Sequence, residues 1–274
     1  MPDDHRLSIT EHIPDGDAAA RPLVVLVHGS LDRAASFARV ARRLDDVHTL
    51  TYDRRGYHRS RNAVPVHTTV EGHVSDLLAV IDERPAVVVG HSYGGDIALG
   101  AALRPGGPGP ILAVGAYEPP LPWLGQWARR NGARPDGSPH PPDEDPGEAA
   151  ERFFRRMVGD AAWERLPERT KADRRADGPA LAAELAAIRT TEAPFDITRL
   201  SVPAVFGRGS ASLPHHRDAV AWLVENVPGS ELVEIDGAGH GAHLTHPEAF
   251  ARFVRAAIAR AVPTDDGRAP AQSR

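Results

Sequence analysis

Short apolar runs alternate along the chain with segments in which apolar residues recur every three or four positions. The runs are rich in Val and Ile and predict buried strands over 23–27, 47–52, 86–89, 111–117, 203–206 and 231–235. Between them, spacings such as Val70, Val74 and Leu77 predict amphipathic helices. Strands and helices that alternate in this way are typical of an α/β protein with a mostly parallel central sheet flanked by helices.

The alternation stops between Leu121 and Asp196. This segment has helical spacing without a strand pattern, and positions 131–147 hold five prolines and three glycines, which is typical of a mobile loop. We therefore predict a core domain of residues 1–120 and 197–262, interrupted by a helical cap over 121–196 and followed by a disordered tail at 263–274. Such an insert lies above the carboxyl ends of the strands, where open α/β sheets bind ligands.

Composition narrows the classes of protein that fit. The 274 residues include no cysteine, which excludes disulfides, thiolate metal sites and a cysteine nucleophile. The net charge of −5 argues against nucleic acid as a partner, and no apolar run approaches the length of about 18 residues that a membrane span needs. The first residues carry acids rather than an apolar core, so we expect no signal peptide and a cytoplasmic protein with a small-molecule substrate.

One short motif carries most of the chemistry. Gly90-His91-Ser92-Tyr93-Gly94 follows a predicted strand directly and precedes a predicted helix over 96–103. In that context a Gly-x-Ser-x-Gly pattern predicts a nucleophile elbow, a tight turn that raises the serine hydroxyl above the sheet edge at a helix N-terminus. The alternative is a Gly- and Ser-rich turn that only connects strand to helix. We favour Ser92 as a nucleophile.

Five motifs in order resemble the α/β-hydrolase-fold superfamily. They are His28-Gly29, Asp53-Arg54-Arg55-Gly56, Gly90 to Gly95, Tyr117-Glu118-Pro119-Pro120 and Gly237-Ala238-Gly239-His240. The resemblance extends from about Arg6 to Ala261 and implies an esterase-like member with a serine nucleophile. Epoxide hydrolases and haloalkane dehalogenases of this fold carry Asp at the elbow, so Ser92 argues against those chemistries. No dinucleotide or phosphate-binding motif follows the first strand, and we expect no cofactor.

A serine hydroxyl needs a positioned base to act as a nucleophile. His240 is the favoured candidate because it ends a glycine-rich loop after the last strand, where its imidazole can reach the elbow. His243 is the alternative base, or a pocket or structural histidine. The spacing of His240, His243 and His246 also suggests a metal site, but His246 precedes Pro247 at a helix start and no carboxylate completes a ligand set. We expect no metal.

The resemblance also implies an oxyanion hole made of two backbone amides, one after the nucleophile and one after His-Gly. These are the amides of Tyr93 and Ser30, although Ser30 also fits a plain loop residue or a helix N-cap. Trp123 and Trp127 follow the two prolines that close the 111–117 strand, and they are candidates for the wall of an acyl pocket. Phe154 and Met157 fit the core of the insert better.

The third member of a catalytic triad departs from the family pattern. The family places an Asp shortly after the strand that follows the insert, and this position holds Ser210. Asp218 falls inside a predicted helix, and Asp236 lies too close to His240 for its loop to fold back. Glu118 is the best candidate, with an ion pair that anchors the insert as the alternative. Because Pro119 follows it, we expect Glu118 to be extended.

Together these residues predict a serine hydrolase of an ester, thioester or lactone that acts through an acyl-enzyme. Acyl transfer or cofactor-free perhydrolysis uses the same site, so both stay open as alternatives. A different class is a non-catalytic ligand-binding protein on this fold. This alternative stays open because Ser210 occupies the position where the family has Asp.

Overall fold

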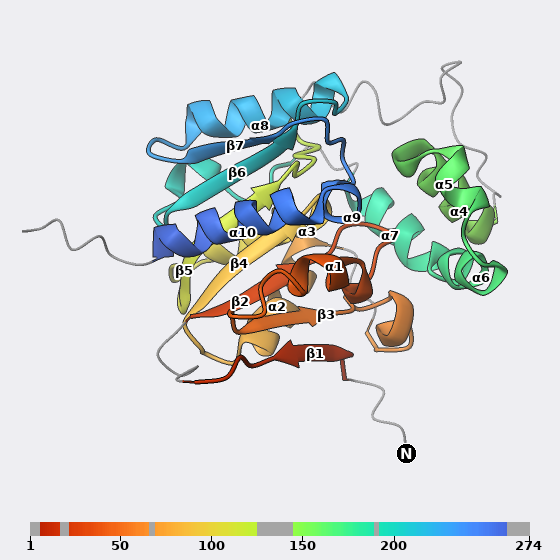
Figure 1. Ribbon diagram of the computed structural model, residues 1–274, viewed down its shortest axis with the longest axis horizontal. Coiled ribbons are helices and arrows are strands. Elements are labelled where there is room, and N and C mark those ends of the chain that lie inside the picture. The colour runs from red at the N-terminus through yellow and green to blue at the C-terminus, as the bar shows by residue number, and fades with distance from the viewer. Residues whose placement is uncertain (1–5, 17–21, 66–68, 125–144, 189–191, 262–274) are drawn as a thin grey trace, which may run out of the picture.

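The computed structural model describes residues 6–16, 22–65, 69–124, 145–188 and 192–261. A seven-stranded sheet of order β1-β3-β2-β4-β5-β6-β7 runs through the molecule (Figure 1). All strand pairs are parallel except that of β1 with β3. The strands are β1 (Ile9–His12), β2 (Leu23–Val27), β3 (Thr49–Tyr52), β4 (Ala86–His91), β5 (Ile111–Tyr117), β6 (Ala204–Gly209) and β7 (Glu231–Ile235).

Helices cover both faces of this sheet. Those of the core are α1 (Ala38–Ala41), α2 (Val70–Ile81), α3 (Tyr93–Ala102), α8 (Pro214–Asn226), α9 (Ala242–Thr245) and α10 (Pro247–Ala261). Every residue of β2 is buried, because Leu23, Val25 and Val27 pack with α2 and α3 while Val24 and Leu26 pack with α1 and α10. The period-two geometry of a strand explains why a continuous apolar run suits this position.

The predicted fold class is confirmed, and its main omission is β1. All four residues of this edge strand are exposed, so it lacks the apolar run by which the other strands were predicted. It pairs with β3 on one side only. Among the described residues, no helix is long and apolar enough to cross a membrane.

Four described helices lie between β5 and β6, beyond the carboxyl ends of the parallel strands (Figure 1). They are α4 (Pro146–Val158), α5 (Asp160–Glu164), α6 (Glu168–Ala176) and α7 (Gly178–Ile188). Phe154, Trp163 and Leu181 form a small core with Leu31, a residue of the loop after β2. This small core joins the inserted helices to the sheet domain.

The loop predicted over 131–147 extends too far toward the C-terminus, because helix α4 already begins at Pro146. Asp145 accepts hydrogen bonds from the backbone N–H groups of Gly147 at 2.9 Å and Glu148 at 3.0 Å, so it caps α4, and Pro146 occupies the first helical turn. Proline and glycine mark a helix start here rather than a loop. Positions 131–144 and the tail at 263–274 lie outside the described residues.

Candidate active site

The turn between β4 and α3 brings Ser92 to the edge of the sheet. Ser92 has φ 53° and ψ −129°, a backbone conformation that L-residues rarely adopt. A Cβ on Gly90 would lie 2.0 Å from the carbonyl oxygen of Gly94, and one on Gly94 would lie 2.2 Å from that of Val27. Both positions therefore require glycine, which is the steric reason for the spacing in the sequence. The residue between them is held in a strained turn at the start of α3.

His240 meets Glu118 above the neighbouring strands. Its Nδ1–H donates to Glu118 Oε2 at 2.8 Å, and the Glu118 side chain is completely buried. Glu118 Oε1 accepts from the backbone N–H of Gly209 at 2.8 Å and from the hydroxyl of Ser212. Because β5 lies between β4 and β6, an acid at its carboxyl end starts close to the elbow. The contact expected between Glu118 and His240 is therefore present.

The backbone of Glu118 differs from the expectation. Its φ is 46°, in the left-handed region, although the following proline favours an extended conformation. The backbone N–H of Glu118 donates to Gly207 at 3.0 Å, and its carboxylate accepts from three groups. These tertiary hydrogen bonds outweigh the local preference, and the strain is stored at the residue that orients His240.

The other acids considered lie elsewhere. Asp236 is exposed and accepts from the Ser210 hydroxyl at 3.1 Å, and Asp218 is exposed on α8. His216 was not identified from the sequence as part of the site. Its ring stacks on that of His240, with ring centroids 4.0 Å apart and an interplanar angle of 11°. Burial and the neighbouring His240 lower the pKa of His216 well below its usual value, so the ring of His216 stays neutral beside His240.

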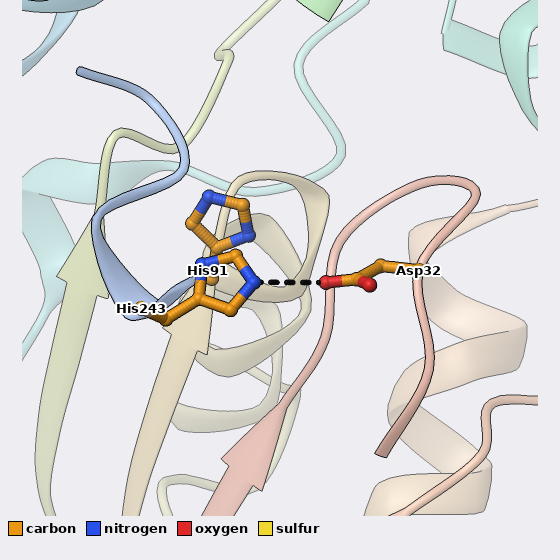
Figure 2. Close-up of side chains that lie close together, drawn as sticks. All are labelled: Asp32, His91 and His243. Atoms are coloured by element: carbon orange, nitrogen blue, oxygen red, sulfur yellow. Dashed lines mark hydrogen bonds and ion pairs between the residues drawn. The ribbon is translucent and has the colours of Figure 1, made fainter. Parts of the chain in front are cut away.

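A second histidine–carboxylate pair lies beside the first. Figure 2 shows His243, from α9, pointing at Asp32 of the loop after β2, with His91 next to it. His243 Nε2 donates to Asp32 Oδ2 at 3.1 Å, and the rings of His91 and His243 are 4.2 Å apart. Burial opposes ionisation of Asp32, but the hydrogen bond from His243 and the charge of Arg174 hold its pKa well below the usual range.

Donor atoms of Asp32, His91 and His243 lie within 4.8 Å of one another, and so do those of Glu118, His216 and His240. Charge argues against a cation at the first cluster, because Arg174 Nη2 already lies 3.8 Å from Asp32 Oδ1. In the second cluster, protein donors occupy both oxygens of Glu118. Each group is better described as a hydrogen-bonded histidine–carboxylate pair with a second imidazole ring against it than as a metal site.

A pocket of about 510 Å³, measured with the space open to solvent at its mouth, lies over Ser92 and His240. Its apolar wall comes from α4 and comprises Phe153, Phe154, Met157 and Val158. Trp123 does not belong to the described lining of this pocket and packs edge-on against Phe195 at 5.2 Å. Trp127 lies outside the described residues. Phe154 belongs to the core of the insert, as expected, and it also lines the pocket, as does Met157.

The loop of His28, Gly29 and Ser30 touches the elbow. A Cβ on Gly29 would lie 2.8 Å from Cβ of Ser92, so only glycine permits this approach. Tyr93 is the first residue of α3, where a backbone N–H has no partner within the helix. The residues expected to supply an oxyanion hole, Ser30 and Tyr93, thus flank Ser92 in space.

The family model for the alpha/beta hydrolase family matches residues 24–253. An uncharacterized hydrolase, YraK of Bacillus subtilis, is 42% identical over 88 residues, which are 30% of this chain and 32% of that protein. The lipase LipV of Mycobacterium tuberculosis is 35% identical over 103 residues, which are 36% of this chain and 37% of that protein. The matches span about a third of the length of these curated relatives.

Solved structures resemble the chain over most of its length. An enol-lactonase from Burkholderia xenovorans superposes with a TM-score of 0.68 at 20% identity, over 92% of this chain and 97% of the other. A thermophilic esterase from Thermogutta terrifontis gives a TM-score of 0.69 at 20% identity, over 93% of each chain. At this identity the likeness concerns the fold.

Proposed function

The chain belongs to the alpha/beta hydrolase family, and we propose that it is a serine hydrolase that cleaves a carboxylic ester, thioester or lactone through an acyl-enzyme. The observation that carries this proposal is the hydrogen bond of 2.8 Å between buried Glu118 and Nδ1 of His240, a residue that lines the same pocket as Ser92. The lipase and the esterase among its relatives and structural neighbours support the same class of bond.

In the proposed mechanism, Ser92 Oγ attacks the carbonyl carbon while its proton passes to His240 Nε2. Glu118 holds the imidazole in the tautomer that leaves Nε2 free to accept, and its charge stabilises the imidazolium. The amides of Ser30 and Tyr93 would donate to the developing oxyanion. The proton then moves from His240 to the leaving alcohol or thiol, and water hydrolyses the acyl-enzyme with His240 again acting as base.

The pocket indicates the side of the substrate that the protein recognises. Phe153, Phe154, Met157 and Val158 form an apolar wall from α4, and burial of apolar surface there favours an acyl or alkyl chain over a strongly polar group. We therefore propose esters or lactones with a short hydrophobic chain as the first substrates to test.

A fluorophosphonate probe and a p-nitrophenyl ester series test this function. The probe reacts only with an activated serine, so the wild-type chain is expected to be labelled at Ser92 and to hydrolyse the esters. Ser92→Ala should lose both activities and keep its circular dichroism spectrum. Labelling or turnover that persists in Ser92→Ala would contradict the assignment. A wild-type chain that binds esters without labelling would instead support a ligand-binding protein.

A further inference from the structure

A buried ion pair connects the inserted helices to the loop beside the nucleophile. Glu184 lies on α7 with 1% of its surface exposed, and Arg54 lies in the loop after β3 with none exposed. Arg54 Nη1 donates to Glu184 Oε2 at 2.8 Å, and the hydroxyl of Ser30 donates to Glu184 Oε1. A carboxylate of the insert therefore binds both an arginine of the core and a residue of the proposed oxyanion loop.

Arg54 binds the same loop from the other side. Its Nε donates to the carbonyl of His28 and its Nη2 to the carbonyl of Gly29, each at 3.0 Å. The backbone N–H of Arg54 donates to His28 Nε2 at 2.9 Å. All three residues of the loop, from His28 to Ser30, are thus hydrogen-bonded to Arg54 or to Glu184.

A shift of the loop from His28 to Ser30 would affect the geometry of the proposed oxyanion hole. A Cβ on Gly29 would lie 2.8 Å from Cβ of Ser92, so the loop approaches the elbow closely and a displacement of the loop changes the position of the Ser30 amide relative to Ser92. An oxyanion donor works only when it is preorganised, within about 3 Å of the place where the charge develops. The anchoring of the loop is therefore a condition for efficient catalysis.

We propose that Glu184 is a positioning residue for catalysis, which fixes the Ser30 amide through Arg54 and the Ser30 hydroxyl. This inference rests on the proposed function and adds a catalytic task for the inserted helices besides lining the pocket. Burial opposes the charge of Glu184, but Arg54 and the nearby His73 lower its pKa to about 2, so the anchor is ionised at neutral pH.

A second acid of the insert provides a matched control. Asp177 is also 1% exposed and pairs with an arginine of the core, Arg61, at 2.7 Å. Its other contacts are to the N–H of His58 at 3.0 Å and to Arg33 Nη2 at 3.7 Å. None of these residues belongs to the loop from His28 to Ser30. Glu184→Gln and Asp177→Asn therefore make the same chemical change at equally buried acids, although the partner Arg61 is partly exposed and Arg54 is not.

The experiment compares both variants of the full chain by steady-state hydrolysis of p-nitrophenyl butyrate and by the rate of fluorophosphonate labelling. Glu184→Gln should lower kcat about 10- to 100-fold with KM changed less than about threefold, since an interaction made mainly in the transition state is weakened. Its pH profile should keep the midpoint of the wild type, because His240 and Glu118 are untouched. Asp177→Asn should keep kcat within about twofold, because none of its contacts reaches the loop from His28 to Ser30.

Equal kcat in the two variants would overturn the inference and leave Glu184 as a structural ion pair. If Glu184→Gln fails to fold, Ser30→Ala removes only the hydroxyl link and keeps both the ion pair and the backbone amide. It should lower kcat about three- to tenfold, and an unchanged kcat there would also overturn the inference. A wild-type chain that neither hydrolyses the ester nor reacts with the probe would overturn the inference and the proposed function together.

Discussion

Two histidines three positions apart each pair with a carboxylate in the same pocket, yet their surroundings differ. The side chain of His240 is 11% exposed and its partner Glu118 is fully buried, whereas the side chain of His243 is 2% exposed and its partner Asp32 is 11% exposed. In the part of the chain that the structure describes, the one ion pair of Glu118 is with His240. Asp32 is shared between His243 and Arg174.

This difference in surroundings indicates which carboxylate can stabilise a positive charge on its histidine. A carboxylate whose charge is already balanced by a guanidinium gains little from a second positive charge on an imidazole. A carboxylate surrounded by neutral donors, as Glu118 is by Gly209 and Ser212, can stabilise an imidazolium that forms during the reaction. The proposed function therefore places proton transfer at the pair of His240 with Glu118, and we expect the pair of His243 with Asp32 to support the structure of the pocket.

The largest expected effect separates the two histidines. His240→Ala should lower kcat by about 10⁴-fold or more, because members of a triad act as a unit. His243→Ala should keep kcat within about tenfold and lower the free energy of unfolding by about 3 kcal/mol, since it leaves Asp32 buried with one partner fewer. Ester hydrolysis and urea unfolding of both variants measure this. Similar losses of kcat would make His243 a second essential base.

The next effect tests the acid. Glu118→Gln should lower kcat about 10³- to 10⁴-fold, because an amide NH₂ facing His240 Nδ1 favours the tautomer that cannot accept the serine proton. The variant keeps an oxygen for Gly209 and Ser212, so its circular dichroism should match the wild type. Asp218→Asn and Asp236→Asn serve as controls and should stay within about twofold of wild-type kcat. A fully active Glu118→Gln would contradict a catalytic role for Glu118 and leave it a structural one.

The smallest effect on turnover is expected at Asp32, where the change should appear in stability instead. The folded-state pKa of Asp32 lies below its unfolded value. Its contribution to stability is therefore present above about pH 4 and lost as the pH falls through the folded pKa. Asp32→Asn should lower the free energy of unfolding at pH 7 by about 3 kcal/mol and flatten its dependence on pH below 4. Urea titrations from pH 7 to 3 measure both, and a pH dependence identical to the wild type would assign the acid sensitivity to other carboxylates.

Local patterns predicted the frame of this protein well. Apolar runs marked six of the seven strands, and five of these are buried along most of their length, as parallel strands covered on both faces must be. The sixth, β7, lies at the other edge of the sheet and buries only Ile235. The elbow was equally predictable, since Gly90 and Gly94 face backbone atoms that admit no side chain. The edge strand β1 was not predicted because it buries no residue. Its backbone hydrogen bonds to β3 cannot be inferred from the pattern of hydrophobic residues.

The lining of the pocket could not be predicted in the same way. Trp123 was a candidate because it follows the prolines after β5, but the described wall comes from α4, which begins more than twenty residues later. Which face of α4 turns toward Ser92 depends on how it packs against α6 and α7. Helical periodicity identifies an apolar face without indicating whether that face meets a core or a cavity.

By itself, the sequence determined six of the seven strands, the strained serine turn and the histidine loop, because each depends on the sterics or hydrophobicity of neighbouring residues. Only the tertiary structure decided which groups meet. Glu118 and His240 are 122 positions apart, and Ser30 and Glu184 are 154 apart. The positive φ of Glu118 shows the same hierarchy, since tertiary hydrogen bonds overrode the preference that Pro119 imposes. Contacts over such separations follow from strand order and helix packing, and these depend on the free energy of the whole chain rather than on any local pattern.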